Sequence, residues 1–146
     1  QGPIAFGDFF VGNNLNSKTG PVREAGGTTD YNFAASFAEG QTIIKNASEL
    51  KVKESDRLHA TSMGLKTMNV KHDLLDDGLI INGIQDDVEI HKEIESFGDH
   101  RIAMSFLIAS VRSNSEIMVE DCENILTSFP NFVETMNSLG MKIYEK

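Results

Sequence analysis

Two short runs of charged residues have the types and positions needed to handle an anion. They are residues 53–57 (KESDR) and residues 99–101 (DHR), and each lies where an apolar-periodic helix is predicted to begin. A helix start presents unpaired backbone N–H groups and the positive end of the helix dipole, so an arginine there favours phosphate or carboxylate. Two such starts in one small domain predict a ligand with two anionic groups.

Each run also has an ordinary structural interpretation. Glu54 and Arg57 are three residues apart, a spacing typical of an exposed ion pair that contributes about 0.3 kcal/mol. Asp99 is of a type that caps helix starts, and it can do so while Arg101 binds a ligand. His100 can either orient a neighbour or simply lie exposed. The residue types alone leave these alternatives open.

The hydrophobic pattern predicts the elements that position these runs. Helices are expected at 30–39, 55–68, 99–112 and 128–139, and strands at 8–11, 42–46, 91–97, 116–121 and 141–145. Residues 69–75 and 79–82 are predicted to form a hairpin around Asp76-Asp77-Gly78, a strong turn signal. Ser55 is the expected N-cap of the helix that carries Arg57.

The chain repeats itself at an offset of about 70 residues, which indicates two copies of one unit. Residues 103–106 (AMSF) echo residues 34–37 (AASF), and the two copies cover about 28–84 and 90–146. Each copy is predicted to be a βαβαββ unit, so the expected fold class is α+β (α/β) with helices on one side of mixed sheets. Residues 4–146 are expected to form a single domain, and residues 1–3 are interpreted as a tag remnant.

Composition narrows the classes of partner. The 146 residues carry a net charge of -9, which argues against nucleic acid, and no run approaches the roughly 18 apolar residues of a membrane span. A cytoplasmic protein is therefore expected. The single cysteine, Cys122, excludes an internal disulfide and a cysteine-based metal cluster, and it is expected to be a small core residue.

Four motifs resemble, in order and spacing, the C-terminal part of the EPSP synthase (3-phosphoshikimate 1-carboxyvinyltransferase) family. They are residues 34–42 (AASFAEGQT), 49–58 (ELKVKESDRL), 99–106 (DHRIAMSF) and 127–132 (TSFPNF). The resemblance implies a fold of two domains, each built from three βαβαββ units. It also implies transfer of the enolpyruvyl group of phosphoenolpyruvate to the 5-hydroxyl of shikimate 3-phosphate, in aromatic amino acid biosynthesis, without metal or organic cofactor.

The same resemblance implies roles for individual residues. Glu54 matches the glutamate that works in proton transfer, and Lys53 matches a lysine near the shikimate 3-phosphate and the reacting centre. Arg57 and Arg101 match arginines that bind phosphoenolpyruvate, and His100 falls within the same substrate-binding motif. A planar guanidinium suits both anionic groups because it can pair with two oxygens at once.

Two departures from the family pattern limit these implications. Asp30 is the nearest match to the catalytic aspartate, but the family's Asp-Glu-Tyr-Pro run is replaced by Asp30-Tyr31-Asn32-Phe33. The N-terminal domain, which supplies further substrate contacts, has no counterpart in these residues. We therefore expect one wall of an active site that needs a complementary N-terminal domain or chain and is inactive alone. The alternative is a non-catalytic anion-binding or scaffold domain derived from the family.

Overall fold

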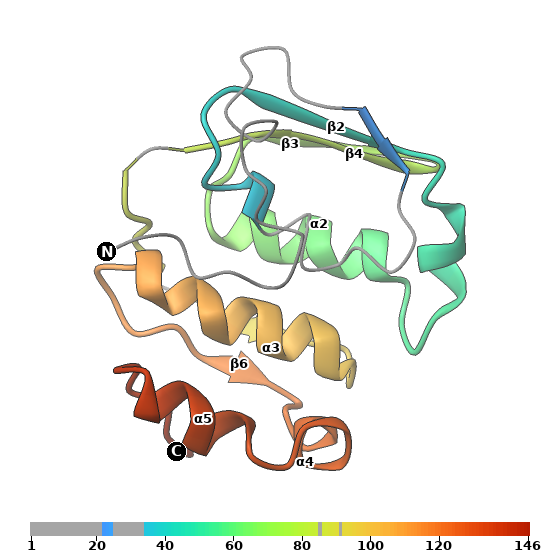
Figure 1. The fold of residues 1–146 in the computed structure, drawn as a ribbon. Coiled ribbons are helices and arrows are strands. Elements are labelled where there is room, and N and C mark those ends of the chain that lie inside the picture. The colour runs from blue at the N-terminus through green and yellow to red at the C-terminus, as the bar shows by residue number, and fades with distance from the viewer. Residues whose placement is uncertain (1–21, 25–33, 85, 91) are drawn as a thin grey trace.

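The computed structural model of the chain describes residues 22–24, 34–84, 86–90 and 92–146. Figure 1 shows a sheet at the top of the view, with helix α2 packed beneath it and α3 beneath α2. Helices α4 and α5 lie at the bottom. Among the described helices, none is long and apolar enough to cross a membrane.

The larger sheet has the strand order β1 (Val22–Glu24), β2 (Gln41–Lys45), β4 (Gly78–Asn82), β3 (His72–Leu75). β1 runs parallel to β2, whereas β2, β4 and β3 are antiparallel. The predicted hairpin is confirmed, with Asp76 and Asp77 as its two loop residues. Gly78 is required next to this loop because a Cβ there would lie 1.9 Å from the Ile44 carbonyl oxygen.

A 3-10 helix, η3 (Ser48–Val52), leads from the sheet to α2 (Arg57–Thr67). The predicted cap was wrong by one residue: Asp56 caps α2 by accepting a hydrogen bond from His59 N at 3.0 Å. Ser55 and Asp56 are both good capping types, so the local sequence could not choose between them. The 3-10 helix had not been predicted.

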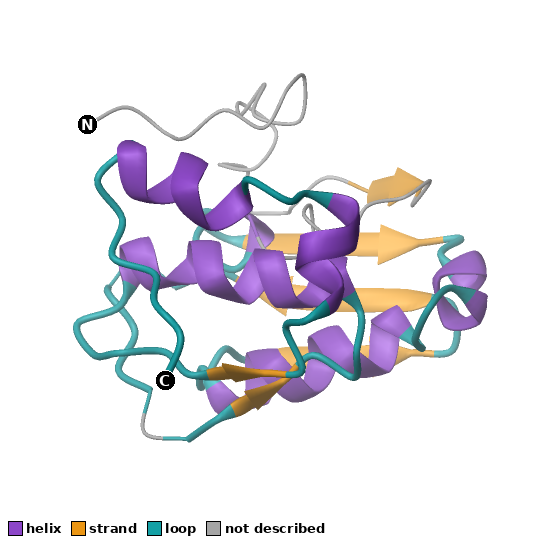
Figure 2. Cartoon of the chain, turned by 90° about the horizontal axis from the view of Figure 1, so that it is seen from below, coloured by secondary structure: helices purple, strands orange, loops and turns teal. Residues whose placement is uncertain are grey.

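The second half of the chain contains β5 (Ile94–Glu95), α3 (His100–Ala109), η4 (Ser110–Arg112) and β6 (Val119–Glu120). β5 and β6 pair in parallel as a separate two-stranded sheet, seen beside the helices in Figure 2. Both strands are shorter than the predicted 91–97 and 116–121. Phe97 and Asp121, each with φ of 56°, leave the extended region and end them.

Three further expectations need correction. The predicted helix 30–39 keeps helical geometry at residues 34–35 and then turns, while residues 30–33 and the predicted strand 8–11 lie outside the described residues. The predicted helix 128–139 is instead α4 (Asn124–Ser128) and α5 (Phe132–Ser138). Pro130 explains the break, because it disfavours helical geometry at the residue before it.

The predicted strand at 141–145 does not form. The side chain of Asn137 takes its place as a partner for the backbone of Ile143. Ile143 N donates to Asn137 Oδ1 at 2.7 Å, and Asn137 Nδ2 donates to Ile143 O at 2.9 Å. A side-chain amide therefore satisfies backbone groups that a neighbouring strand would otherwise pair.

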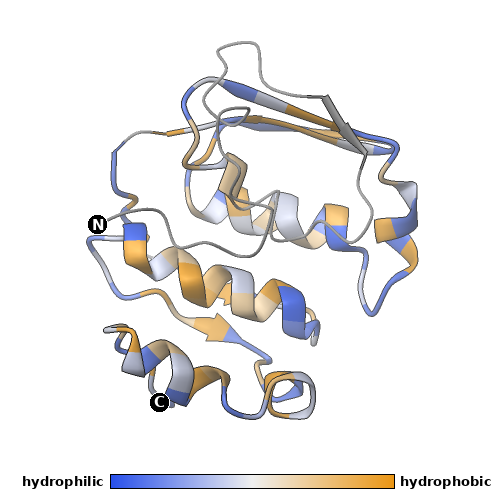
Figure 3. Cartoon of the chain, viewed as in Figure 1, coloured by the Kyte–Doolittle hydropathy of each residue, from blue (hydrophilic) through white to orange (hydrophobic). Residues whose placement is uncertain are grey.

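Helix α3 separates two apolar clusters. Ile102 and Phe106 join the larger cluster beneath the sheet, whereas Ala103 joins a smaller one with α4 and α5. Cys122, expected in the core, is half-buried against the smaller cluster. Figure 3 shows that α3 is apolar along most of its length and hydrophilic at its first turn. That polar turn carries the second predicted anion-binding run.

Candidate anion-binding site at two helix starts

Asp99 joins the starts of α2 and α3. As the N-cap of α3, its Oδ1 atom accepts from Arg101 N at 2.9 Å, and its Oδ2 atom accepts from Arg57 Nε at 2.7 Å. In Figure 1 both helices begin on the right of the view and run side by side. One buried carboxylate thus brings together two runs that are 42 residues apart in sequence.

Arg57 is held between two carboxylates at this junction. Arg57 as a whole is only 3% exposed, and its Nη2 atom contacts Glu54 as well as Asp99 Oδ1. The Ser55 hydroxyl donates to Asp99 Oδ2 at 2.9 Å. A buried guanidinium requires such partners, because burying an unpaired ion costs on the order of several kcal/mol.

The hydrogen bonds around Asp99 also fix its charge state. Burial by itself would raise the pKa of this carboxyl, but hydrogen bonds from Arg57 and Ser55, together with the positive charge of Arg57, outweigh burial. The pKa is therefore held below its ordinary value. Asp99 remains a carboxylate, and it can act as cap and ion-pair partner at the same time.

The structure brings most of the predicted site residues to this junction. Lys53 and Glu54 are exposed just before α2, Arg101 is exposed in the first turn of α3, and His100 is half-buried beside it. Asp30 lies outside the described residues. The Glu54–Arg57 pair exists, but it is not the exposed pair of the ordinary interpretation, because the Arg57 side chain is 4% exposed.

Sequence reasoning identified Asp99 as a cap but missed it as a partner of Arg57, and it missed the hydrogen bond from Ser55 to Asp99. Contacts across more than 40 residues leave no periodic signal in the chain. A buried arginine inside a charged run is also hard to foresee, since arginine is mostly exposed. The only local sign was that both helix starts carried an arginine and an aspartate.

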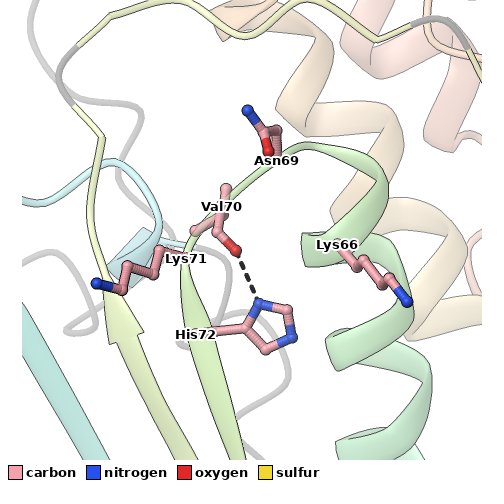
Figure 4. A pocket seen from close by; sticks show the side chains of 5 residues that line it. All are labelled: Lys66, Asn69, Val70, Lys71 and His72. Carbon is pink, nitrogen blue, oxygen red and sulfur yellow. Dashed lines mark hydrogen bonds between the residues drawn. The ribbon is translucent and has the colours of Figure 1, made fainter.

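A concavity at the other end of α2 does not belong to this site. It has a volume of about 460 Å³ and is lined by Lys66, Asn69, Val70, Lys71 and His72. In Figure 4 the ammonium groups of Lys66 and Lys71 point to opposite sides, while the His72 Nδ1 atom is hydrogen-bonded to the Val70 carbonyl at 2.8 Å. These cations do not converge, and Lys66 lies nine residues along α2 from Arg57, or about 14 Å at 1.5 Å per residue.

The chain is similar to known proteins over most of its length. The family model described as EPSP synthase (3-phosphoshikimate 1-carboxyvinyltransferase) matches residues 26–136. The 3-phosphoshikimate 1-carboxyvinyltransferase of Magnetococcus marinus is 46% identical over 110 residues, which are 75% of this chain and 25% of that protein. The enzyme of that name from Ruthia magnifica is 50% identical over 115 residues, with 76% and 25% covered.

Solved structures agree with the sequence relatives. A structure of EPSP synthase from Acinetobacter baumannii superposes with a TM-score of 0.76 at 41% identity, covering 80% of this chain and 27% of that one. The chain spans about a quarter of the length of the curated relatives it matches. Sequence motifs, family model and structural likeness agree, and the chain belongs to the EPSP synthase family.

Proposed function

We propose that this chain forms one wall of an enolpyruvyl transferase active site, which acts on phosphoenolpyruvate and shikimate 3-phosphate. The observation that carries the proposal is the Asp99 carboxylate, which holds the two arginine-bearing helix starts together. Three exposed charged residues adjoin this junction in sequence, within the part of the chain that the family model matches: Lys53, Glu54 and Arg101.

The reaction needs one group that moves protons and several that hold negative charge. The 5-hydroxyl oxygen bonds to C2 of phosphoenolpyruvate as a proton reaches C3, and then the C2–O bond to phosphate breaks as C3 loses a proton. Glu54 is the proposed proton carrier, because its side chain is 54% exposed and lies beside the positive Arg57. Asp30 is the proposed base for the 5-hydroxyl, on its resemblance to the family aspartate.

Positive groups around Glu54 are the proposed anion receptors. The exposed Arg101 side chain suits the carboxylate or phosphate of phosphoenolpyruvate, with His100 beside it. Lys53 is proposed to contact the shikimate 3-phosphate. Arg57 contacts Glu54 in the structure, so we propose that an incoming anion displaces Glu54 from Arg57 Nη2. The same exchange would release the Glu54 carboxylate for proton transfer.

The second wall is proposed to come from a complementary N-terminal domain or chain. Effective catalysis requires both substrates to be held in near-attack geometry, and one wall leaves them largely in water. The 146-residue chain by itself is therefore expected to release no phosphate from phosphoenolpyruvate and shikimate 3-phosphate.

Complementation tests this proposal. The chain is mixed with the portion of the Acinetobacter baumannii EPSP synthase that it does not match, and phosphate release is measured with both substrates. We expect activity only in the mixture, lost with Glu54→Gln and kept with Glu49→Gln, which alters another exposed glutamate five residues away. Turnover of roughly 1 to 1000 per second by the chain alone would contradict the half-site proposal. Equal activity of the two variants would contradict the role of Glu54.

A further inference from the structure

The turn between β5 and α3 has an uncommon backbone. Phe97 and Gly98 have φ angles of 56° and 68°, and Asp99 N donates to Ser96 O at 3.0 Å. Two left-handed central residues closed by this hydrogen bond correspond to a type I′ turn, whose first central position is usually Asn, Asp or Gly. Phenylalanine there is disfavoured, because its Cβ approaches the following carbonyl oxygen.

Three different elements hold this turn in place. Ser96 is buried, and its hydroxyl donates to Asp121 O at 2.8 Å, next to β6. The Gly98 carbonyl accepts from Asn124 Nδ2 at the start of α4. The Phe97 ring meets the ring of His59, on α2, edge to face with centroids 5.9 Å apart. A strained conformation persists where surrounding contacts determine it in this way, and such residues cluster at functional sites.

The turn determines where the Asp99 carboxylate lies. Only Phe97 and Gly98 separate the buried Ser96, which anchors the end of β5, from Asp99. The chain direction at Asp99 therefore depends on both left-handed residues. With this geometry, Asp99 reaches Arg57 Nε and the first N–H groups of α3 together. An extended or right-handed residue at position 97 would turn this carboxylate away from one of its two partners.

We infer that Phe97 is a positioning residue for Arg57. Its left-handed backbone, held by the ring contact with His59, directs the Asp99 carboxylate to the guanidinium. The orientation of Arg57 follows from contacts in the structure, whereas its consequence for ligand binding rests on the proposed function. Phe97 does not itself touch the reacting groups in this account.

Two substitutions of Phe97 distinguish the effect of its backbone conformation from the effect of its ring. Phe97→Asn removes the ring but tolerates a positive φ, whereas Phe97→Val removes the ring and disfavours that conformation. The Arg57 Nε–H group, which donates to the buried Asp99, should exchange slowly with solvent. Phenylalanine already has a Cβ at this positive φ, so the added cost of valine is that of its β-branched side chain. We expect Phe97→Val to speed this exchange several-fold and Phe97→Asn to stay near the wild type.

A matched control places the same strain elsewhere. Asn69, with φ of 58°, lies just beyond the C-terminal end of α2, so Asn69→Val should lower stability without selective exchange at Arg57. Urea denaturation is used to check that each variant is folded under the conditions in which hydrogen exchange is measured. If Phe97→Val does not fold, His59→Ala tests the ring contact in a chain with the native turn, and it too should speed Arg57 exchange relative to Asn69→Val.

Each result of these exchange measurements either supports or overturns the inference. Faster Arg57 exchange with Phe97→Val but not with Phe97→Asn supports the inference. Unchanged exchange with Phe97→Val, or equal acceleration by both substitutions, overturns the backbone role. Parallel titration with phosphoenolpyruvate distinguishes the two proposals: if exchange responds as expected but the wild type does not bind this ligand, the proposed function fails and the positioning of Arg57 stands.

Discussion

Arg57 Nε and Asp99 Oδ2 lie 2.7 Å apart, and the two side chains are 4% and 0% exposed. This ion pair, together with the hydrogen bond from Ser55 to Asp99, joins the start of α2 to the start of α3. Because both partners are buried, neither can turn to water if the other is lost. The stability of the junction therefore depends on the pair as a unit.

Asp99→Asn should expose this dependence. Asparagine can still cap α3, so the main loss is the charge that balances a buried guanidinium. We expect the free energy of unfolding, measured by urea denaturation, to fall by about 3–5 kcal/mol. The control is Asp87→Asn, which breaks the half-exposed pair with Arg112 and should cost under about 1 kcal/mol. Similar losses in the two variants would contradict the central place of Asp99.

The depressed pKa of Asp99 gives a prediction in acid. Since the folded-state pKa lies below the ordinary value of 3.8, the carboxylate contributes stability that is fully present above pH 3.8. That contribution is lost as the pH falls through the folded-state pKa. The difference in unfolding free energy between the wild type and Asp99→Asn should therefore be constant near neutrality and shrink below about pH 4. A difference in unfolding free energy that grew in acid would contradict this prediction.

Gly64→Ala tests the packing that brings the two helices together. Alanine favours a helix over glycine by about 1 kcal/mol, but its Cβ would lie 1.8 Å from Phe106 Cζ, in the core. Overpacking of this kind costs about 1–3 kcal/mol, so we expect a net loss of stability. Phe106→Leu combined with Gly64→Ala should be less destabilised than the sum of the two single variants. Strict additivity would mean that the two residues do not meet.

Glu54→Gln tests whether the glutamate shields Arg57 from an incoming anion. Removing its charge should strengthen phosphoenolpyruvate binding by roughly two- to fivefold, the effect of one partly exposed ion pair of up to about 1 kcal/mol. Glu49→Gln, a charge change on the neighbouring 3-10 helix, should have a smaller effect. Weaker binding by Glu54→Gln would mean that Glu54 supports the ligand instead of competing with it.

Local signals in the sequence predicted the elements better than their contacts. The hairpin followed from Asp76-Asp77-Gly78, and each arginine-bearing run lies at or just before a helix start, as predicted. The Arg57–Asp99 pair could not be predicted, because it joins residues 42 positions apart. Pro130 was a readable signal for the break between α4 and α5 that the apolar pattern obscured. The strand predicted at 141–145 does not form. The side chain of Asn137, and not a neighbouring strand, pairs with the backbone of Ile143, and the apolar pattern of these residues could not reveal that.

The most direct test of the account is whether the two helix starts bind one anion together. In an NMR titration of the chain with phosphoenolpyruvate, the amide resonances of residues 53–57 and 99–101 should shift with a single dissociation constant in the millimolar range, or about -4 kcal/mol. Arg101→Ala should abolish both sets of shifts, whereas Arg112→Ala, in η4 just beyond the end of α3, should leave them. Shifts at one helix start only, or none at tens of millimolar ligand, would contradict a shared site.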